Sequence, residues 1–342
     1  MKWLVSLCLL FSITGYAQKR DTVLKYFDAA LHFTTKKEAV YFGAAIRQET
    51  GWFVFALYPD TSYVITAYYK DKALTVKDGP YALYYAKNNP AAIGMYRDND
   101  RTGVWRTWYQ NGQLKDSGFL YYNIPGGLWK NWYANGQLKN ECVFKTDAAM
   151  QERSTFQAMT LLTKNAGVYD GLFHSWYENG NLEASGTFTN DTMTGVWHWY
   201  HQNGTQSTIE EYKKGKVVSL DCFDTSGAAS GTMCSLSKPA LLRQYGDYHV
   251  YIQQNLLWPK EALKKGLEGD VHVTFRVTKE GRLEDLIIET AEPVFKKAVD
   301  ALFATMTDWI PAVSHNRVID TDEELTIPFY KKQEPQVSEP EE

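Results

Sequence analysis

A motif of about two dozen residues recurs along the middle of the chain and constrains its fold more than any other feature. It opens with glycine, continues with Trp, Tyr and other large apolar residues, and then reaches an Asn-Gly pair. Copies begin at Gly79 (a weaker copy), Gly103, Gly127, Gly171 and Gly195. Successive copies start 24 residues apart, except that 44 residues separate Gly127 from Gly171, which indicates an insertion at 147–166. Such a fixed period predicts a repeat architecture.

Each copy predicts a β-hairpin. Its first half is rich in Trp, Tyr and Val, which suit a half-buried strand. The Asn-Gly pairs, such as Asn111-Gly112, are the strongest local signal for a type I′ turn, which needs positive φ at both central residues. Polar residues and the next starting glycine are expected to turn the chain into the following copy. Because one hairpin cannot bury its own face, several stacked copies are needed for stability.

Two aromatic positions and one polar position recur in the four stronger copies. The first aromatic column is Trp105, Trp129, Phe173 and Trp197, the second is Trp108, Trp132, Trp176 and Tyr200, and the polar column between them is Arg106, Lys130, His174 and His198. Recurring aromatic columns favour packing ladders, with a face that binds sugars or peptides as the alternative. The polar column favours a solvated face. A metal site is not expected there, because equivalent positions in successive copies lie about 9–10 Å apart.

The glycine, Trp-Tyr, Asn-Gly and Leu pattern of residues 79–227 resembles the MORN-like repeats of the YwqK antitoxin family. The resemblance implies an all-β repeat scaffold. The family's name implies toxin neutralisation, but a function does not transfer with a scaffold alone. The upstream segment 41–69 alternates as strands do and is expected to begin the same sheet.

The first residues predict export. Lys2 precedes a mostly apolar run at 3–13, and small residues follow at Gly15 and Ala17, as in a secretory signal peptide cleaved between Ala17 and Gln18. The apolar run is too short to span a bilayer stably. The mature chain is therefore expected in the periplasm, with attachment to the outer membrane through partners as an option.

Net charge and cysteine content narrow the class of protein further. With a net charge of −4 over 342 residues, nothing indicates binding to nucleic acid or to an anionic membrane surface. Three cysteines follow the predicted cleavage site, too few for a disulfide framework. The spacing of Cys222 and Cys234 is compatible with a disulfide in an oxidising compartment, and equally with a buried reduced pair.

From about Tyr248 the repeat gives way to mixed helix and strand signals. The expected elements are a helix at 258–266, strands at 270–277 and 282–289, a helix at 293–306 and a strand at 323–330. In the first strand Val271, Val273, Phe275 and Val277 alternate onto one face. The charged, proline-containing residues 331–342 predict a disordered tail.

This order of elements, with its motifs, resembles the TonB C-terminal domain over about residues 248–330. Trp258-Pro259 stands where that family usually has Tyr-Pro, Trp309 opens its W-x-PA motif, and Pro328 lies in its closing apolar-Pro-apolar-Phe pattern. The resemblance implies a periplasmic domain that binds an extended peptide of an outer-membrane receptor by adding a strand to its sheet. The residues expected to contact the partner are Gln254, Trp258, Thr326, Pro328 and Tyr330.

The sequence departs from a true TonB energy transducer, which keeps an uncleaved membrane helix and a proline-rich spacer. Here a cleavable signal and a repeat sheet are predicted in those places. The predicted fold is a β-rich chain with a C-terminal α+β domain. Its divisions are a signal peptide at 1–17, a repeated β-hairpin sheet at 18–235 with the 147–166 insertion, a TonB-like helix-strand-strand-helix-strand domain at 236–330 and a tail at 331–342.

The favoured function is an exported, non-catalytic adaptor that binds protein partners in the cell envelope. Two alternatives stay open: an accessory or variant TonB that contributes to receptor-dependent transport, and glycan or peptidoglycan binding by the aromatic repeat face. No catalytic site, metal or cofactor is expected. The sequence has no His/Cys ligand cluster, no phosphate-binding glycine loop in the right context and no Gly-x-Ser-x-Gly elbow.

Overall fold

The computed structural model describes residues 21–146, 167–231 and 234–330. The predicted signal peptide with its cleavage site at Ala17 and Gln18, the 147–166 insertion and the 331–342 tail lie outside these ranges. The chain divides into two compact units, residues 1–180 with 187–192 and residues 181–186 with 193–342. This division falls within the repeat sheet, so the domain boundary between residues 235 and 236 stays a prediction.

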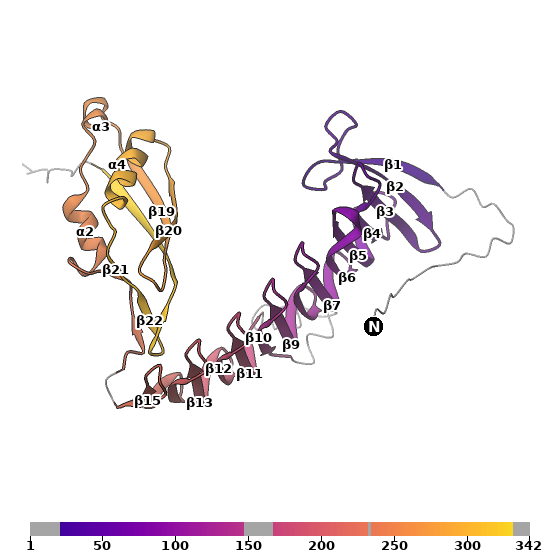
Figure 1. Cartoon of the computed structure of the whole chain (residues 1–342). Coiled ribbons are helices and arrows are strands. Elements are labelled where there is room, and N and C mark those ends of the chain that lie inside the picture. Colours follow the sequence, from indigo (N-terminus) through magenta and orange to yellow (C-terminus); the bar gives the residue numbers. More distant parts are fainter. Residues whose placement is uncertain (1–20, 147–166, 232–233, 331–342) are drawn as a thin grey trace, which may run out of the picture. The chain divides into compact units, whose positions relative to one another are not determined.

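Sixteen strands form one antiparallel sheet in which each strand pairs with the next one along the chain (Figure 1). They are β1 (Thr22–Phe27), β2 (Tyr41–Gln48), β3 (Gly51–Leu57), β4 (Tyr63–Tyr69), β5 (Lys77–Tyr85), β6 (Asn89–Arg97), β7 (Asp100–Trp108), β8 (Leu114–Tyr121), β9 (Ile124–Trp132), β10 (Leu138–Phe144), β11 (Tyr169–Trp176), β12 (Leu182–Thr189), β13 (Thr192–Tyr200), β14 (Gln206–Lys213), β15 (Lys216–Phe223) and β16 (Ala229–Gly231). The predicted sheet of repeated hairpins is confirmed. The segment 41–69 forms β2 to β4 of this sheet, but the sheet begins one strand earlier than predicted, at β1.

The turns between these strands correct the predicted turn type. At the Asn-Gly ends, Gly112 has positive φ (85°) but Asn111 does not, so the loop is not a type I′ turn. The Asn111 side chain instead accepts a hydrogen bond from the Gln113 amide at 3.0 Å and donates one to the Ala134 carbonyl of the next loop at 2.7 Å. Two-residue turns with positive φ at both positions lie at the opposite strand ends, at Asp98-Asn99, Tyr122-Asn123 and Asn190-Asp191. In the Asn-Gly loops, asparagine therefore stabilises the loop through hydrogen bonds of its side chain and not through positive φ.

The first aromatic column packs on glycines of the preceding strand. An added Cβ at Gly94, Gly118 and Gly186 would come within 2.2, 2.0 and 2.1 Å of the indole rings of Trp105, Trp129 and Trp197 respectively. Only glycine leaves room for the ring at such a position. Trp105 and Trp197 are buried, which supports the packing interpretation for this column. The second column is half-buried.

The second unit also contains the predicted α+β domain, whose helices pack on a three-stranded sheet of order β20-β19-β24 (Figure 1). Its elements are β17 (Ser237–Lys238), β18 (Leu241–Leu242), α2 (Tyr248–Asn255), α3 (Lys260–Lys265), β19 (Gly269–Val277), β20 (Leu283–Glu289), α4 (Pro293–Phe303), β21 (Trp309–Ile310), β22 (Ala312–Ser314), β23 (Arg317–Ile319) and β24 (Thr321–Phe329). The alternating valines of β19 face Phe295 and Val299 of α4 in one core. The predicted order is confirmed, with α2 and the β22–β23 hairpin as additions.

Candidate functional site

The sheet of the α+β domain has an outer edge formed by β24. This strand pairs with β19 over nine consecutive residues without a register shift, from Thr321 opposite Val277 to Phe329 opposite Gly269. Ile327 and Phe329 point into the core, whereas Thr326 and Pro328 lie on the exposed face. Alternation along the strand therefore places the predicted partner-binding residues Thr326 and Pro328 together.

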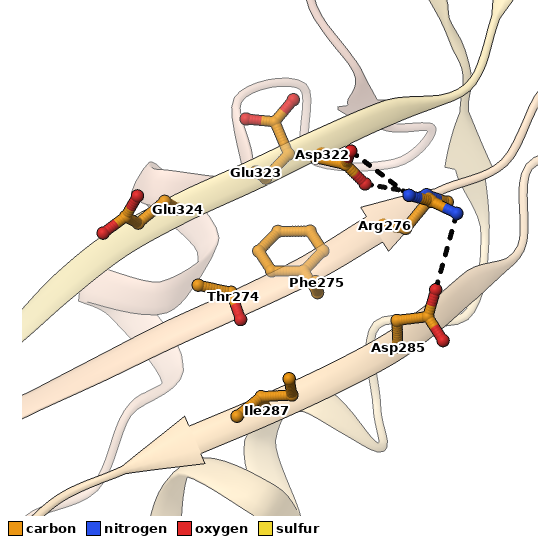
Figure 2. A pocket seen from close by; sticks show the side chains of 8 residues that line it. All are labelled: Thr274, Phe275, Arg276, Asp285, Ile287, Asp322, Glu323 and Glu324. Atoms are coloured by element: carbon orange, nitrogen blue, oxygen red, sulfur yellow. Dashed lines mark hydrogen bonds and ion pairs between the residues drawn. The ribbon is translucent and has the colours of Figure 1, made fainter. Parts of the chain in front are cut away.

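Charged side chains line a shallow pocket of about 320 Å³ on this exposed face (Figure 2). The guanidinium of Arg276 lies between two strands: its Nε donates to Asp322 at 2.7 Å, and its Nη1 lies 3.6 Å from the Asp285 carboxylate. The hydrogen bond from Arg276 lowers the pKa of Asp322. Because all three groups are exposed to solvent, this pairing contributes little to stability. The face is thus polar and acidic around one cation.

The other predicted contact residues occupy different surroundings. Tyr330 follows β24, is 52% exposed and donates its hydroxyl to Asp270 at 3.1 Å. Trp258 lies between α2 and α3, is half-buried and packs edge-on against Phe329, with ring centroids 5.6 Å apart. Gln254 is exposed on α2. The structure therefore brings Thr326, Pro328 and Tyr330 onto one strand end, with Trp258 in contact with that strand from its core side.

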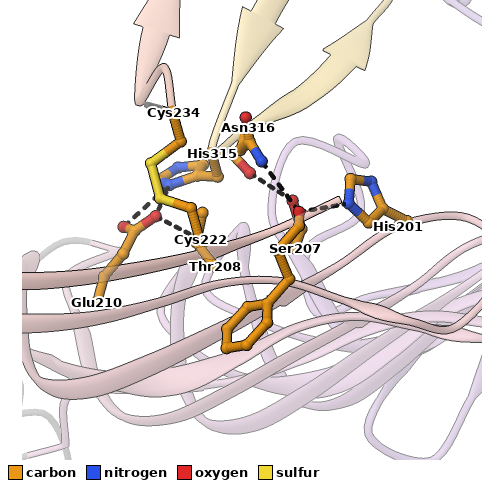
Figure 3. The surroundings of a disulfide bond; sticks show 9 residues. His201, Ser207, Thr208, Glu210, Cys222, Cys234, His315 and Asn316 are labelled. Carbon is orange, nitrogen blue, oxygen red and sulfur yellow. Dashed lines mark hydrogen bonds and ion pairs between the residues drawn. A yellow bond between two sulfur atoms is a disulfide. The ribbon is translucent and has the colours of Figure 1, made fainter. Parts of the chain in front are cut away.

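A second functional feature was missed by the sequence analysis: the tip of the β22–β23 hairpin docks on the last repeat hairpin, β13–β14 (Figure 3). The His315 ring stacks on Trp199, with centroids 3.5 Å apart, and the Arg317 guanidinium lies 4.9 Å from the same ring. Arg317 also donates to Glu183 at 3.0 Å. The Ser207 hydroxyl donates to the His315 carbonyl at 2.8 Å.

A buried carboxylate, Glu210, lies at the centre of this contact. It is fully buried and accepts hydrogen bonds from Thr208 at 2.6 Å, from Tyr212 at 2.7 Å and from His315 Nδ1 at 2.9 Å. Burial raises the pKa of the Glu210 carboxyl, but the hydrogen bonds from His315, Thr208 and Tyr212 outweigh burial and hold it below its ordinary value. A buried charge is stable only when paired in this way, so the carboxylate fixes the hairpin tip in place.

The structure joins Cys222 and Cys234 in a disulfide beside this contact, with Cα atoms 6.1 Å apart (Figure 3). Cys222 belongs to the next strand, β15, and Cys234 precedes β17. The bond therefore ties the end of the repeat sheet to the segment that leads into the α+β domain. Of the two states left open by the sequence, the structure has the disulfide.

Two breaks in the repeat pattern could have indicated this contact from the sequence. Glu210 occupies the position at which earlier copies have Gly94, Gly118 and Gly186, and Trp199 occupies that of Thr107, Asn131 and Ser175. A large or charged residue at a position that is otherwise small signals a different neighbour. The sequence contains no signal for the β22–β23 hairpin, because its turn, His315-Asn316, contains no glycine.

Within residues 21–146, 167–231 and 234–330, no group of three or more His, Cys, Asp or Glu side chains is placed to hold a metal ion. In the same ranges no helix is long and apolar enough to cross a membrane.

Comparison with protein families finds a match in each of two regions of the chain. Residues 254–330 match the family of the Gram-negative bacterial TonB protein C-terminal region. The MORN repeat variant matches residues 101–119, 125–146 and 169–190. No curated protein matches the chain. Both families are non-catalytic, and the first indicates a TonB-like envelope protein that takes part in protein interaction. Residues 254–330 are therefore a TonB C-terminal domain, preceded by MORN repeats between residues 101 and 190.

Proposed function

We propose that the protein is an exported, non-catalytic adaptor of the periplasm whose TonB-like domain binds an extended peptide of a partner by strand addition at β24. The observation that carries the proposal is the edge itself. In the described residues β24 is the last strand of its sheet and pairs on one side only. A peptide that adds a strand to such an edge gains main-chain hydrogen bonds along its whole length.

The opposite edge of the same sheet, β20, is less suited to strand addition. Its register with β19 shifts between Thr274 and Arg276, and Asp285 has a left-handed backbone with φ of 53°. Bulges of this kind bend an edge strand and interrupt its ladder of donors and acceptors. The unbroken edge of β24 is therefore the better template.

The alternation of backbone N–H groups along β24 determines which of them would face the peptide. Backbone N–H groups alternate between the two sides of a strand, and a proline within a sheet directs its nitrogen to the open edge. Because the nitrogen of Pro328 is on the open side of β24, the N–H of Thr326 points to the open edge as well, and the N–H of Ile327 points toward β19. Peptide side chains next to the exposed face would meet Asp322 and Glu324, which favours a basic or polar sequence there.

Two proline substitutions separate strand addition from other modes of binding. Thr326→Pro removes an outward N–H and should leave the domain folded, whereas Ile327→Pro removes a ladder hydrogen bond and should unfold it. Circular dichroism and thermal melting of the full-length protein check both expectations.

Because the partner is unidentified, its binding to the TonB-like domain is measured by crosslinking in living cells. A photo-crosslinking phenylalanine analogue replaces Tyr330, and mass spectrometry identifies what it captures. We expect a defined envelope protein whose capture is lost when Thr326→Pro is added. The analogue at Ile287, exposed on β20, is the matched control and should not capture that protein. If capture persists in the Thr326→Pro background, strand addition at this edge is wrong.

A further inference from the structure

The registers of the repeat strands show that each hairpin offers the same set of positions on the face that carries Trp105. Two neighbouring cross-strand pairs can be compared between the hairpins β7–β8, β9–β10 and β13–β14. In that order, the first pair is Thr107–Asp116, Asn131–Asn140 and Trp199–Thr208. The second pair is Trp105–Gly118, Trp129–Cys142 and Trp197–Glu210. The place where the β22–β23 tip docks, on Trp199, Thr208 and Glu210, therefore has direct counterparts in the hairpins β7–β8 and β9–β10.

These counterparts line an open groove of about 450 Å³ over β7 to β10. Thr107, Asp116, Asn131 and Asn140 contribute partly exposed polar groups, and Trp129 is the half-buried aromatic residue beside them. In the last hairpin, by contrast, the equivalent Thr208 and Glu210 are fully buried beneath the docked tip. The groove therefore occupies the repeat positions that are equivalent to the docked contact, with Thr107 and Asn131 in place of Trp199 and with Gly118 and Cys142 in place of Glu210.

The polar groups of the groove keep hydrogen-bonding capacity. The Thr107 hydroxyl donates to the Asp116 carboxylate, and the Asn131 amide donates to the Asn140 carbonyl oxygen at 2.6 Å. A carboxylate accepts further hydrogen bonds, and the Asn140 NH₂ group can still donate. An aromatic wall of this groove also accepts a guanidinium, because Arg101 lies 5.6 Å from the Trp105 ring.

We propose that this groove is a second docking site, and that its occupant is a β-turn of a partner protein that presents a basic side chain beside an amide side chain. The docked tip of the chain's own hairpin has this chemistry in His315, Asn316 and Arg317. Asp116, which occupies the position of Thr208, would pair with the basic group, the role that Glu210 has toward His315. Asn131 and Asn140 would bond the amide.

The charge of the groove favours a basic turn over a saccharide. Only 5% of the surface of Trp105 is exposed, so this ring has no free face on which a sugar could stack, although Trp129, Phe144 and Tyr169 are half-buried in the lining. The Asp116 carboxylate can form an ion pair with a basic side chain, which a neutral sugar does not offer. The proposal concerns β7 to β10 and does not depend on strand addition at β24.

The test uses a fluorescent, backbone-cyclised hairpin peptide with the tip sequence Ser-His-Asn-Arg, titrated into the full-length protein and followed by anisotropy. We expect saturable binding. Asp116→Asn should weaken it about tenfold or more, since a charge-assisted hydrogen bond is lost. Glu141→Gln is the matched control: it removes a carboxylate of the neighbouring hairpin β9–β10 that pairs with Lys130, and it should not change the affinity. A peptide with alanine at both basic positions should lose binding, which tests the occupant without altering the protein.

Other outcomes would overturn the proposal. They are no saturable binding of the peptide, equal binding by the parent and Asp116→Asn, or binding only after deletion of residues 147–166, which would mean that the chain covers its own groove. A chitooligosaccharide that binds with the same dependence on Asp116, when the peptide does not, would make the groove a glycan site. Thr326→Pro should leave peptide binding unchanged, so failure here and failure of strand addition are distinguishable.

Discussion

The substitution Gly118→Ala tests whether the glycines of the repeat exist to receive the tryptophans. Its Cβ would lie 2.0 Å from Cδ2 of Trp129. Carbon atoms pack at about 3.5–4.0 Å, so the ring must retreat by about 1.5 Å. That shift breaks the hydrogen bond from the Trp129 indole to the Phe119 carbonyl, 3.1 Å long. Overpacking costs about 1–3 kcal/mol and the lost hydrogen bond about 1 kcal/mol more.

We therefore expect Gly118→Ala to lower the free energy of local opening by about 2–4 kcal/mol. Hydrogen exchange of peptides from β8 and β9, read by mass spectrometry in the full-length protein, measures this quantity. Gly118 is not among the glycines with positive φ, so alanine meets no backbone strain and the effect reports the ring alone.

The matched background is Trp129→Ala, which removes the ring. There Gly118→Ala should be neutral or stabilising by about 0.5–1 kcal/mol, the usual advantage of alanine over glycine in a strand. A cost equal to that in the parent would refute the reasoning, because it would show that something other than Trp129 requires glycine at this position.

Three further predictions concern the docked hairpin, the disulfide and export. Folding lowers the pKa of Glu210, so the carboxylate stabilises the fold above the ordinary pKa of 4.5, and this stabilisation is lost as the pH falls through the lower folded pKa. The Tm should therefore fall below about pH 4.5, and it should fall less in Glu210→Gln. Reducing Cys222–Cys234, which closes a loop of 12 residues, should cost about 2–4 kcal/mol, seen as a lower Tm with reductant that Cys222→Ser reproduces. N-terminal sequencing of the periplasmic protein should begin at Gln18, and an intact Met1 in a membrane fraction would contradict cleavage after Ala17.

The sequence predicted those parts of the fold whose signal is periodic. The 24-residue period predicted the repeat sheet, and the alternation of Val271, Val273 and Phe275 predicted β19. Both patterns arise because buried positions must recur at the spacing of the element that buries them. The type I′ turns were wrong because asparagine favours a loop in two ways, through positive φ and through its side chain, and the sequence does not distinguish them.

The partner of Glu210 could not be predicted from periodicity. Glu210 breaks the repeat pattern, but His315 lies 105 residues away along the sequence and belongs to no recognisable motif. Their pairing depends on where the α+β domain lies, which no local pattern encodes. The TonB-like sheet is easier to interpret from its sequence, because a proline within a sheet is confined to edges, strand starts or bulges, and β24, which contains Pro328, is an edge strand. Whether a peptide binds there stays a prediction.

The exchange of glycine for Glu210 sets a limit on how the array can evolve. A duplicated 24-residue copy inserted among the earlier hairpins would bring its own glycine and tryptophan, and each ring would again find an empty space behind it. A copy added after β14 would meet a carboxylate side chain in that space, already held by three hydrogen bonds. Additional repeat copies therefore fit before β13 but not after β14. Related proteins should differ in the number of copies on the amino-terminal side of β13.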